Sequence, residues 1–142
     1  MVKEGILYDK TYENKGEVFK KDIHFISRNY KLYPALKQDP ALLEQIKEIE
    51  AEINNRIYYY IPKEKIGEIT PQIQDGDIIL ITTGQEGLDT AHLGFAVREK
   101  HTLKLLHASS TGKKVMITSG SLEDYIRQIP SFTGIMIGRI VN

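Results

Sequence analysis

The sequence predicts a single α+β domain in which one long helix precedes an antiparallel β-meander or half-barrel. Three patterns indicate this fold. Apolar residues recur at helical spacing between residues 39 and 57, short β-branched runs separated by turn residues begin at residue 69, and a short helical segment interrupts those runs. A chain of 142 residues is long enough for one core and too short for two. We therefore expect residues 1–142 to form one domain, helical or mixed over 1–68 and a β-sheet core over 69–142.

The long helix has the clearest signals at its ends. Asp39 is a suitable N-cap and Pro40 suits the first helical position, and the helix should end near residues 54–55. Its apolar positions share one face and should pack on the rest of the domain: Leu42, Ile46, Ile49, Ile53 and Ile57. Before it, residues 17–27 predict a short helix with three apolar points.

The β-rich part follows from alternation and turn residues. The run YYYIPK (residues 58–63) predicts an extended segment, and the DGD run at 75–77 predicts a turn. Five strands are expected, at residues 78–82, 93–97, 103–107, 114–118 and 133–141. Between the last two, Ser121 is a candidate cap for a helix over 122–129, which Pro130 ends.

Composition excludes several classes of function. Nineteen basic residues balance nineteen acidic ones without a basic stripe, which argues against a nucleic-acid partner. No apolar run approaches the roughly 20 residues of a membrane span, and the charged N-terminus MVKEGILYDK does not resemble a signal peptide. The absence of cysteine excludes disulfides, cysteine-ligated zinc and a thiol nucleophile within this chain.

Two histidines stand at the two ends of one predicted hairpin, in HLGFAV (residues 92–97) and LLHASS (residues 105–110). A turn centred between Lys100 and His101 places Gly94 opposite His107, so that His92 and His107 lie diagonally on the same face. Diagonal neighbours are about 7–8 Å apart at the backbone, within reach of two imidazoles. Leu93, Phe95 and Val97 form the other face of their strand, which we expect to enter the core.

A histidine pair of this kind favours one group as a base near neutral pH and the other as the group that orients it. The alternative is that both are structural, partly buried histidines. Ser27, Ser109 and Ser110 are the hydroxyls available as nucleophiles, although no oxyanion hole is indicated. A metal site made of His92, His107 and Asp89 is a further alternative, but the spacing matches no known ligand pattern.

Several ordered stretches together resemble the NlpC-type, papain-like cell-wall cysteine peptidases and amidases of bacteria, in the branch similar to N-acetylmuramoyl-L-alanine amidases. The resemblance covers nearly the whole chain, in the order YPALK (33–37), INNRIYYYIPK (53–63), DGDII (75–79), GLDTAHLGFA (87–96), LLHASS (105–110) and GIMIGRI (134–140).

The resemblance implies a role for each histidine. His92 matches the catalytic histidine, and His107 matches the third member of the triad, which orients its imidazole. It also suggests substrate contacts for Ser109 and Ser110, a loop-shaping role for Asp89 at the groove, and sugar stacking by Tyr60, with no metal or other cofactor.

The sequence departs from the family at the nucleophile. The family's cysteine precedes everything present here, so we expect this chain to be the C-terminal half of a papain-like domain and to be inactive alone. The implied ligand is a muropeptide, and the chain should form an oligomer or associate with a cysteine-bearing segment. The alternative is a non-catalytic module that binds muropeptide or protein. Family members are usually exported, but this sequence does not itself indicate a compartment.

Overall fold

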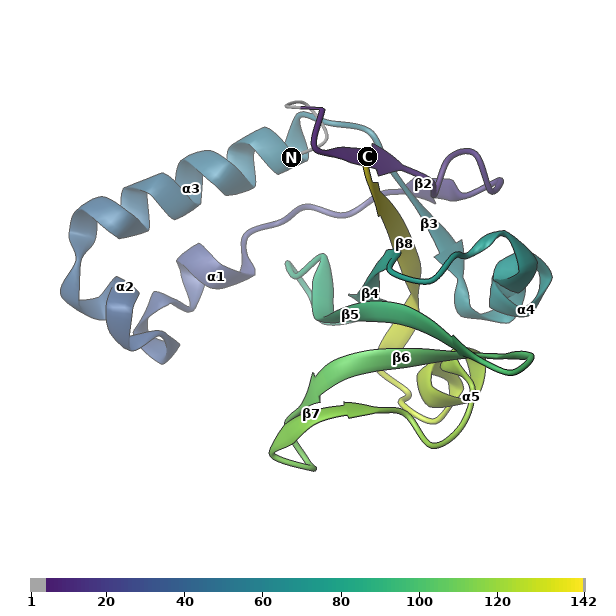
Figure 1. Cartoon of the computed structure of the whole chain (residues 1–142). Coiled ribbons are helices and arrows are strands. Elements are labelled where there is room, and N and C mark those ends of the chain that lie inside the picture. Colours follow the sequence, from purple (N-terminus) through teal and green to yellow (C-terminus); the bar gives the residue numbers. More distant parts are fainter. Residues whose placement is uncertain (1–4, 142) are drawn as a thin grey trace.

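In the computed structural model, residues 5–141 are described, and they form one antiparallel sheet with helices at its edges (Figure 1). The strands are β1 (Leu7–Asp9), β2 (Glu17–Phe19), β3 (Tyr58–Pro62), β4 (Ile78–Thr83), β5 (Thr90–Glu99), β6 (Thr102–Ser109), β7 (Lys114–Ile117) and β8 (Phe132–Ile140). The α-helices are α1 (Phe25–Arg28), α2 (Pro34–Gln38), α3 (Pro40–Asn54), α4 (Ile66–Ile69) and α5 (Leu122–Arg127). Three 3-10 turns are η1 (Tyr30–Leu32), η2 (Lys63–Lys65) and η3 (Thr70–Gln72).

The sheet is antiparallel in the order β2-β3-β8-β4-β5-β6-β7, and β1 also pairs with β8. The α+β class and the four-strand meander from β4 to β7 are therefore confirmed. The last strand does not extend the meander. It lies in the middle of the sheet between β3 and β4. The sheet therefore also contains β1, β2 and β3, which come before residue 69.

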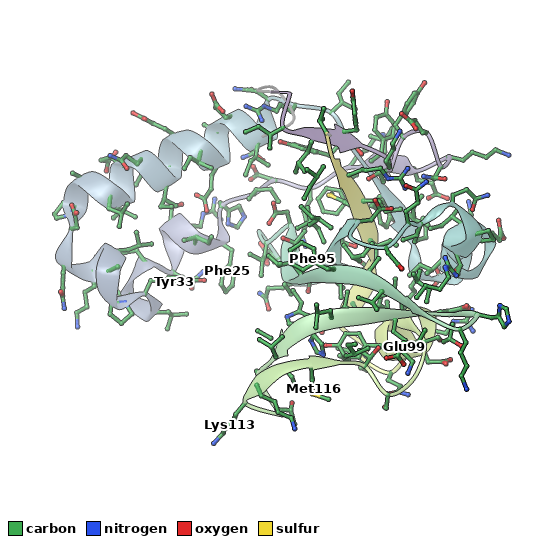
Figure 2. The ribbon with its side chains drawn as sticks, in the orientation of Figure 1. Phe25, Tyr33, Phe95, Glu99, Lys113 and Met116 are labelled. Carbon is green, nitrogen blue, oxygen red and sulfur yellow. The ribbon has the colours of Figure 1, made fainter. Side chains whose placement is uncertain are left out.

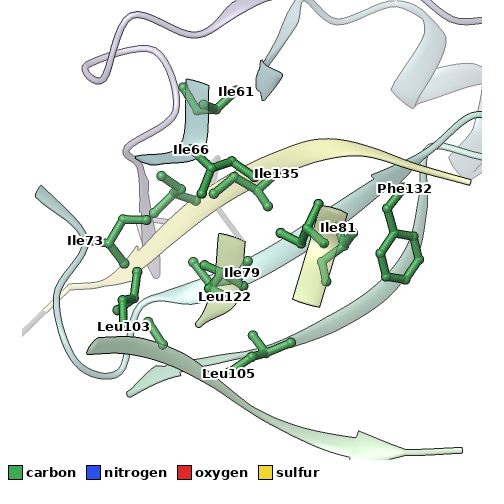
Figure 3. Close-up of a cluster of buried hydrophobic side chains, with 13 residues drawn as sticks. Ile61, Ile66, Ile73, Ile79, Ile81, Leu103, Leu105, Leu122, Phe132 and Ile135 are labelled. Atoms are coloured by element: carbon green, nitrogen blue, oxygen red, sulfur yellow. The ribbon is translucent and has the colours of Figure 1, made fainter. Parts of the chain in front are cut away.

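The hydrophobic core fills the space between the sheet and the short helices α4 and α5 (Figure 3). Ile79 and Ile81 from β4 meet Leu105 from β6 and Ile126 from α5, and all four are fully buried. Burial of an aliphatic side chain of this size stabilises a fold by about 1.5–3 kcal/mol. The core therefore fixes α5 against the sheet beside the ends of β5 and β6.

The long helix begins and ends as expected. Asp39 accepts hydrogen bonds from the backbone N–H groups of Ala41 and Leu42 at 3.0 and 3.1 Å, and α3 ends at Asn54. Its packing differs from the expectation, because Ile49 and Ile57 are 52% and 75% exposed.

The most buried contact of α3 is polar. The residue of this helix that is buried is Glu50, whose carboxylate accepts hydrogen bonds from the N–H groups of Ile26 and Ser27 in α1 at 3.0 and 3.1 Å. In Figure 1, α1 to α3 extend away from the strands as an arm. The apolar face of α3 therefore lacks the core contact that its periodicity predicts.

The prediction of a helix over residues 17–27 is wrong. Residues 17–19 form β2, which pairs with β3 through Val18 and Tyr59, and only residues 25–28 are helical. The pairing partner lies some 40 residues away in the sequence, so a local apolar pattern does not reveal it.

None of the helices in the described part of the chain has the length and apolar character that a bilayer span requires. The papain-like and half-domain details of the expected fold stay predictions.

Candidate functional site

The β5–β6 hairpin has the predicted turn. Glu99 pairs with Thr102 across a two-residue connection, and Phe95 pairs with Leu106. Lys100 takes a positive φ of 57° at the turn, as tight hairpin turns require. This register brings the strand position of His107 beside Gly94 and aligns the two histidines on one face.

The face of β5 that enters the core is the opposite of the one predicted. Leu93 and Phe95 are 55% and 42% exposed, whereas Gly94 and Ala96 are buried. A Cβ atom at Gly94 would lie 2.6 Å from the carbonyl oxygen of Leu106, so only glycine permits this approach of β5 to β6. The side chains of β6 and α5 fill the core on this side, and the small residues of β5 make room for them.

The two imidazoles meet at the end of this buried face. His92 Nε2 and His107 Nδ1 lie 2.7 Å apart, and the two rings are nearly perpendicular with centroids 5.0 Å apart. At this distance one nitrogen donates its proton and the other accepts. The pair is therefore joined by a single N–H···N hydrogen bond.

Burial favours neutral imidazoles here. His107 is only 6% exposed, and burial lowers its pKa below the ordinary histidine value. Burial also lowers the pKa of His92, with a smaller contribution from the nearby His107. Protonation of both rings would place two N–H groups against each other, so one ring must stay neutral whenever the hydrogen bond is intact.

Tyr125 is a site residue that the sequence did not indicate. Its ring lies edge-on to His107 at 5.1 Å between centroids and 6.4 Å from His92, with Phe132 behind it at 6.1 Å. Burial raises the pKa of the Tyr125 phenol. The residue comes from α5, and the local helical pattern showed its helix but not that this helix lies beside the hairpin.

A cavity of about 390 Å³ opens beside the pair. Its lining contains aromatic, hydroxyl and amide side chains and no aspartate, glutamate, lysine or arginine. Ser109 and Ser110 line this cavity together with both histidines, and their contact with substrate stays a prediction. The hydroxyl of Ser109 accepts a hydrogen bond from the N–H of Gly112 at 2.9 Å, which holds the chain after β6 in a turn.

The other two expected substrate residues lie elsewhere. Asp89 lines a different cavity, near the end of α3, and accepts a hydrogen bond from the N–H of Thr90. Tyr60 is on β3, where its ring packs edge-on to Phe19 at 5.6 Å and does not line the histidine cavity. Among residues 5–141 no group of three histidine, aspartate or glutamate side chains is arranged to hold a metal ion.

Comparison with known proteins indicates a family for this chain. The model of the AmiA-like family, described as N-acetylmuramoyl-L-alanine amidase-like, matches residues 3–135. The chain is 35% identical to an N-acetylmuramoyl-L-alanine amidase from Bacteroides uniformis, with a TM-score of 0.91 over 99% of this chain and 60% of that one.

Two further solved structures are similar. A Bacteroides fragilis protein described as a candidate xylanase is 34% identical, with a TM-score of 0.89 over 98% of this chain and 61% of that one. A Legionella pneumophila protein is 26% identical, with a TM-score of 0.62 over 99% of this chain and 58% of that one. No protein with a curated description matches the chain.

The fold is thus an α+β domain similar to that of solved amidases. The chain belongs to the N-acetylmuramoyl-L-alanine amidase-like family. It spans about three fifths of the length of the solved relatives that it matches.

Proposed function

We propose that this chain supplies the histidine pair of a peptidoglycan cysteine amidase of the NlpC papain-like type, which cleaves the amide between N-acetylmuramic acid and L-alanine. The observation that carries the proposal is the 2.7 Å contact between His92 and His107 in a family named for that activity. In this proposal His92 is the catalytic base, and His107 is a positioning residue.

The geometry suggests which proton His92 carries. If His92 Nε2–H donates to His107 Nδ1, the lone pair of His92 Nδ1 is free to take the proton of a thiol. The thiolate then adds to the amide carbonyl, and the imidazolium of His92 returns the proton to the departing amine of L-alanine. Water, activated by the same nitrogen, hydrolyses the resulting thioester and releases the thiol.

The nucleophile has to come from outside these 142 residues, because they contain no cysteine. We therefore expect the isolated chain not to turn over substrate, since loss of one triad member costs several orders of magnitude in rate. The proposal treats the chain as the histidine-bearing half of the complete site.

Hydrolysis assays on the purified chain test this point. N-acetylmuramoyl-L-alanyl peptides should remain intact, and addition of a cysteine-bearing partner segment from a relative should restore cleavage. Cleavage by the chain alone that His92→Ala abolishes would overturn the expected inactivity. Cleavage in the complemented mixture that is unaffected by His92→Ala would overturn the assigned base.

The alternative function is a module that binds muropeptide or protein without chemistry. The uncharged cavity of about 390 Å³ beside Tyr125 favours it, because hydroxyl and aromatic groups together suit neutral, hydroxyl-bearing ligands. Calorimetric titration with N-acetylmuramoyl-L-alanine would give heat at millimolar ligand in this case, while no heat would argue against it.

Association with another chain is also part of the proposal. Leu93, Phe95 and Val115 are exposed on the face of β5 to β7 opposite the core, and Figure 2 shows Phe95 on that part of the sheet. Exposed apolar patches of this kind often mark interaction surfaces. Light scattering should therefore show a dimer, or a complex with a cysteine-bearing segment, and a monomer under both conditions would contradict this prediction.

A further inference from the structure

A second cavity, separate from the histidine site, has three cationic side chains in a lining that is otherwise largely apolar. It has a volume of about 260 Å³ and lies where the segment before α1, the end of α3 and the start of β5 meet. Lys20, Lys21 and Arg56 line it, and Asp89 is the one carboxylate in its lining. The lining residues carry three positive charges and one negative charge in a chain with no net charge, and Arg56 is in turn paired with Glu52.

The walls of this cavity are held in place by hydrogen bonds. Asn54 accepts from the N–H of Ile23 at 2.7 Å and donates to its carbonyl oxygen at 2.9 Å, which fixes the segment before α1 to the end of α3. Lys21 Nζ donates to the carbonyl oxygen of Thr83 at 2.6 Å, which anchors this side chain to the cavity wall. A preorganised site of this kind loses little entropy when it binds an anion.

The other two cations are more open to solvent. Lys20 is exposed, and no ion pair to it is found in the described part of the chain. Arg56 donates one N–H to Glu52 at 2.6 Å, and the rest of its guanidinium fork remains available. Carboxylates are the groups that such a fork binds best, through two parallel hydrogen bonds.

This cavity continues toward the histidine pair along β5. Thr90 lines both it and an apolar surface cavity at Leu93 and Phe95, and that cavity is also lined by His92 and His107. Thr90 precedes His92 by two residues, which is about 7 Å along an extended strand. Along β5, Thr90 at the cationic cavity is therefore followed directly by Ala91 and His92, which line the uncharged cavity beside Tyr125.

We propose that the cationic cavity binds a carboxylate of the peptide on the leaving side of the scissile amide. The identity of that peptide rests on the proposed function. An extended peptide advances about 3.3 Å per residue, so the carboxylate belongs to the second or third residue after the muramoyl group. The uncharged cavity at the other end suits the neutral sugar, so the two ends of the site fix the direction of the substrate.

Nuclear magnetic resonance titration of this chain tests the proposal with a matched pair of probes. The probes are N-acetylmuramoyl-L-alanyl-glutamate and the same compound with both carboxyl groups amidated. The acid should bind about three- to tenfold more tightly, as expected for one or two charge-assisted hydrogen bonds at a partly exposed site. It should also shift the backbone amide signals of Lys21, Arg56 and Thr90.

Variants locate the effect. Lys20→Gln and Arg56→Gln together should reduce binding of the acid to the level of the diamide and leave binding of the diamide unchanged. Lys47→Gln, which removes one positive charge from an exposed site on α3, should change neither. A melting temperature for each variant confirms that it is folded, since both substituted side chains lie at the surface.

Two outcomes overturn the proposal: equal binding of acid and diamide, or acid selectivity that persists in the double variant. A third probe, alanyl-glutamate without the muramoyl group, separates this proposal from the proposed function. If it binds as tightly as the full acid and depends on Lys20 and Arg56 in the same way, the cavity assignment is supported and recognition of the muramoyl group is contradicted.

Discussion

Replacement of Gly94 by alanine should weaken both the fold and the histidine site. The added Cβ would lie 2.6 Å from the carbonyl oxygen of Leu106 and 2.8 Å from the side chain of Leu105. Ordinary contacts begin near 3.4 Å, so β5 and β6 would have to separate by about 0.8 Å, and a backbone oxygen cannot rotate away. We expect a loss of about 1–3 kcal/mol in the free energy of unfolding.

Chemical and thermal denaturation measure this loss. For a chain of this size the melting temperature should fall by about 3–10 °C. The same movement would lengthen the 2.7 Å contact between His92 and His107 beyond hydrogen-bonding range. Gly138→Ala on β8 is the matched control, because a Cβ there would meet its nearest atoms at 3.6 and 3.8 Å. Equal stability of Gly94→Ala and Gly138→Ala would refute the reasoning.

Three other predictions concern stability. Asp77 is 2% exposed and accepts two hydrogen bonds from Arg139, both at 2.7 Å. Asp77→Ala should therefore lower the free energy of unfolding, measured by urea denaturation, by about 3–5 kcal/mol. A loss below about 1 kcal/mol would count against a buried ion pair. Asp39→Ala removes the cap of α3 and should cost about 1 kcal/mol, with a small loss of helical circular dichroism; an unchanged midpoint would show that the cap contributes nothing. Burial lowers the pKa of both His92 and His107 in the folded chain, so the unfolded chain binds more protons below about pH 6.5. The free energy of unfolding should therefore fall as the pH drops from about 7 to 5. The slope should be at most about 1.4 kcal/mol per pH unit for each histidine. The variant His107→Phe should show a flatter profile over that range, and a profile as steep as that of the unmodified chain would contradict this assignment.

Local signals in the sequence were sufficient for α3 and for the hairpin. A capping aspartate followed by proline and a helical apolar repeat leaves few alternatives for residues 39–54, and a polar turn between two apolar runs fixed the register that brings His92 and His107 together. The contact itself was thus predictable once the turn was placed.

The errors arise where the answer depends on distant parts of the chain. Alternation along β5 showed which residues share a face, but it did not show which face α5 would cover, and the bulk of Leu93 and Phe95 favoured the wrong one. The same limit applies to Tyr125, whose place beside His107 depends on how α5 packs on the sheet. The local pattern predicts a helix where β2 forms, because the partner strand β3 lies far along the chain.

The imidazole nitrogens of His92 and His107, observed by nitrogen-15 magnetic resonance at neutral pH, test the central claim most directly. We predict two neutral rings, with the proton of His92 on Nε2, a coupling across the hydrogen bond to His107 Nδ1, and an unprotonated Nδ1 on His92. Two rings that titrate independently near the ordinary histidine pKa, with no coupling between them, would contradict the account.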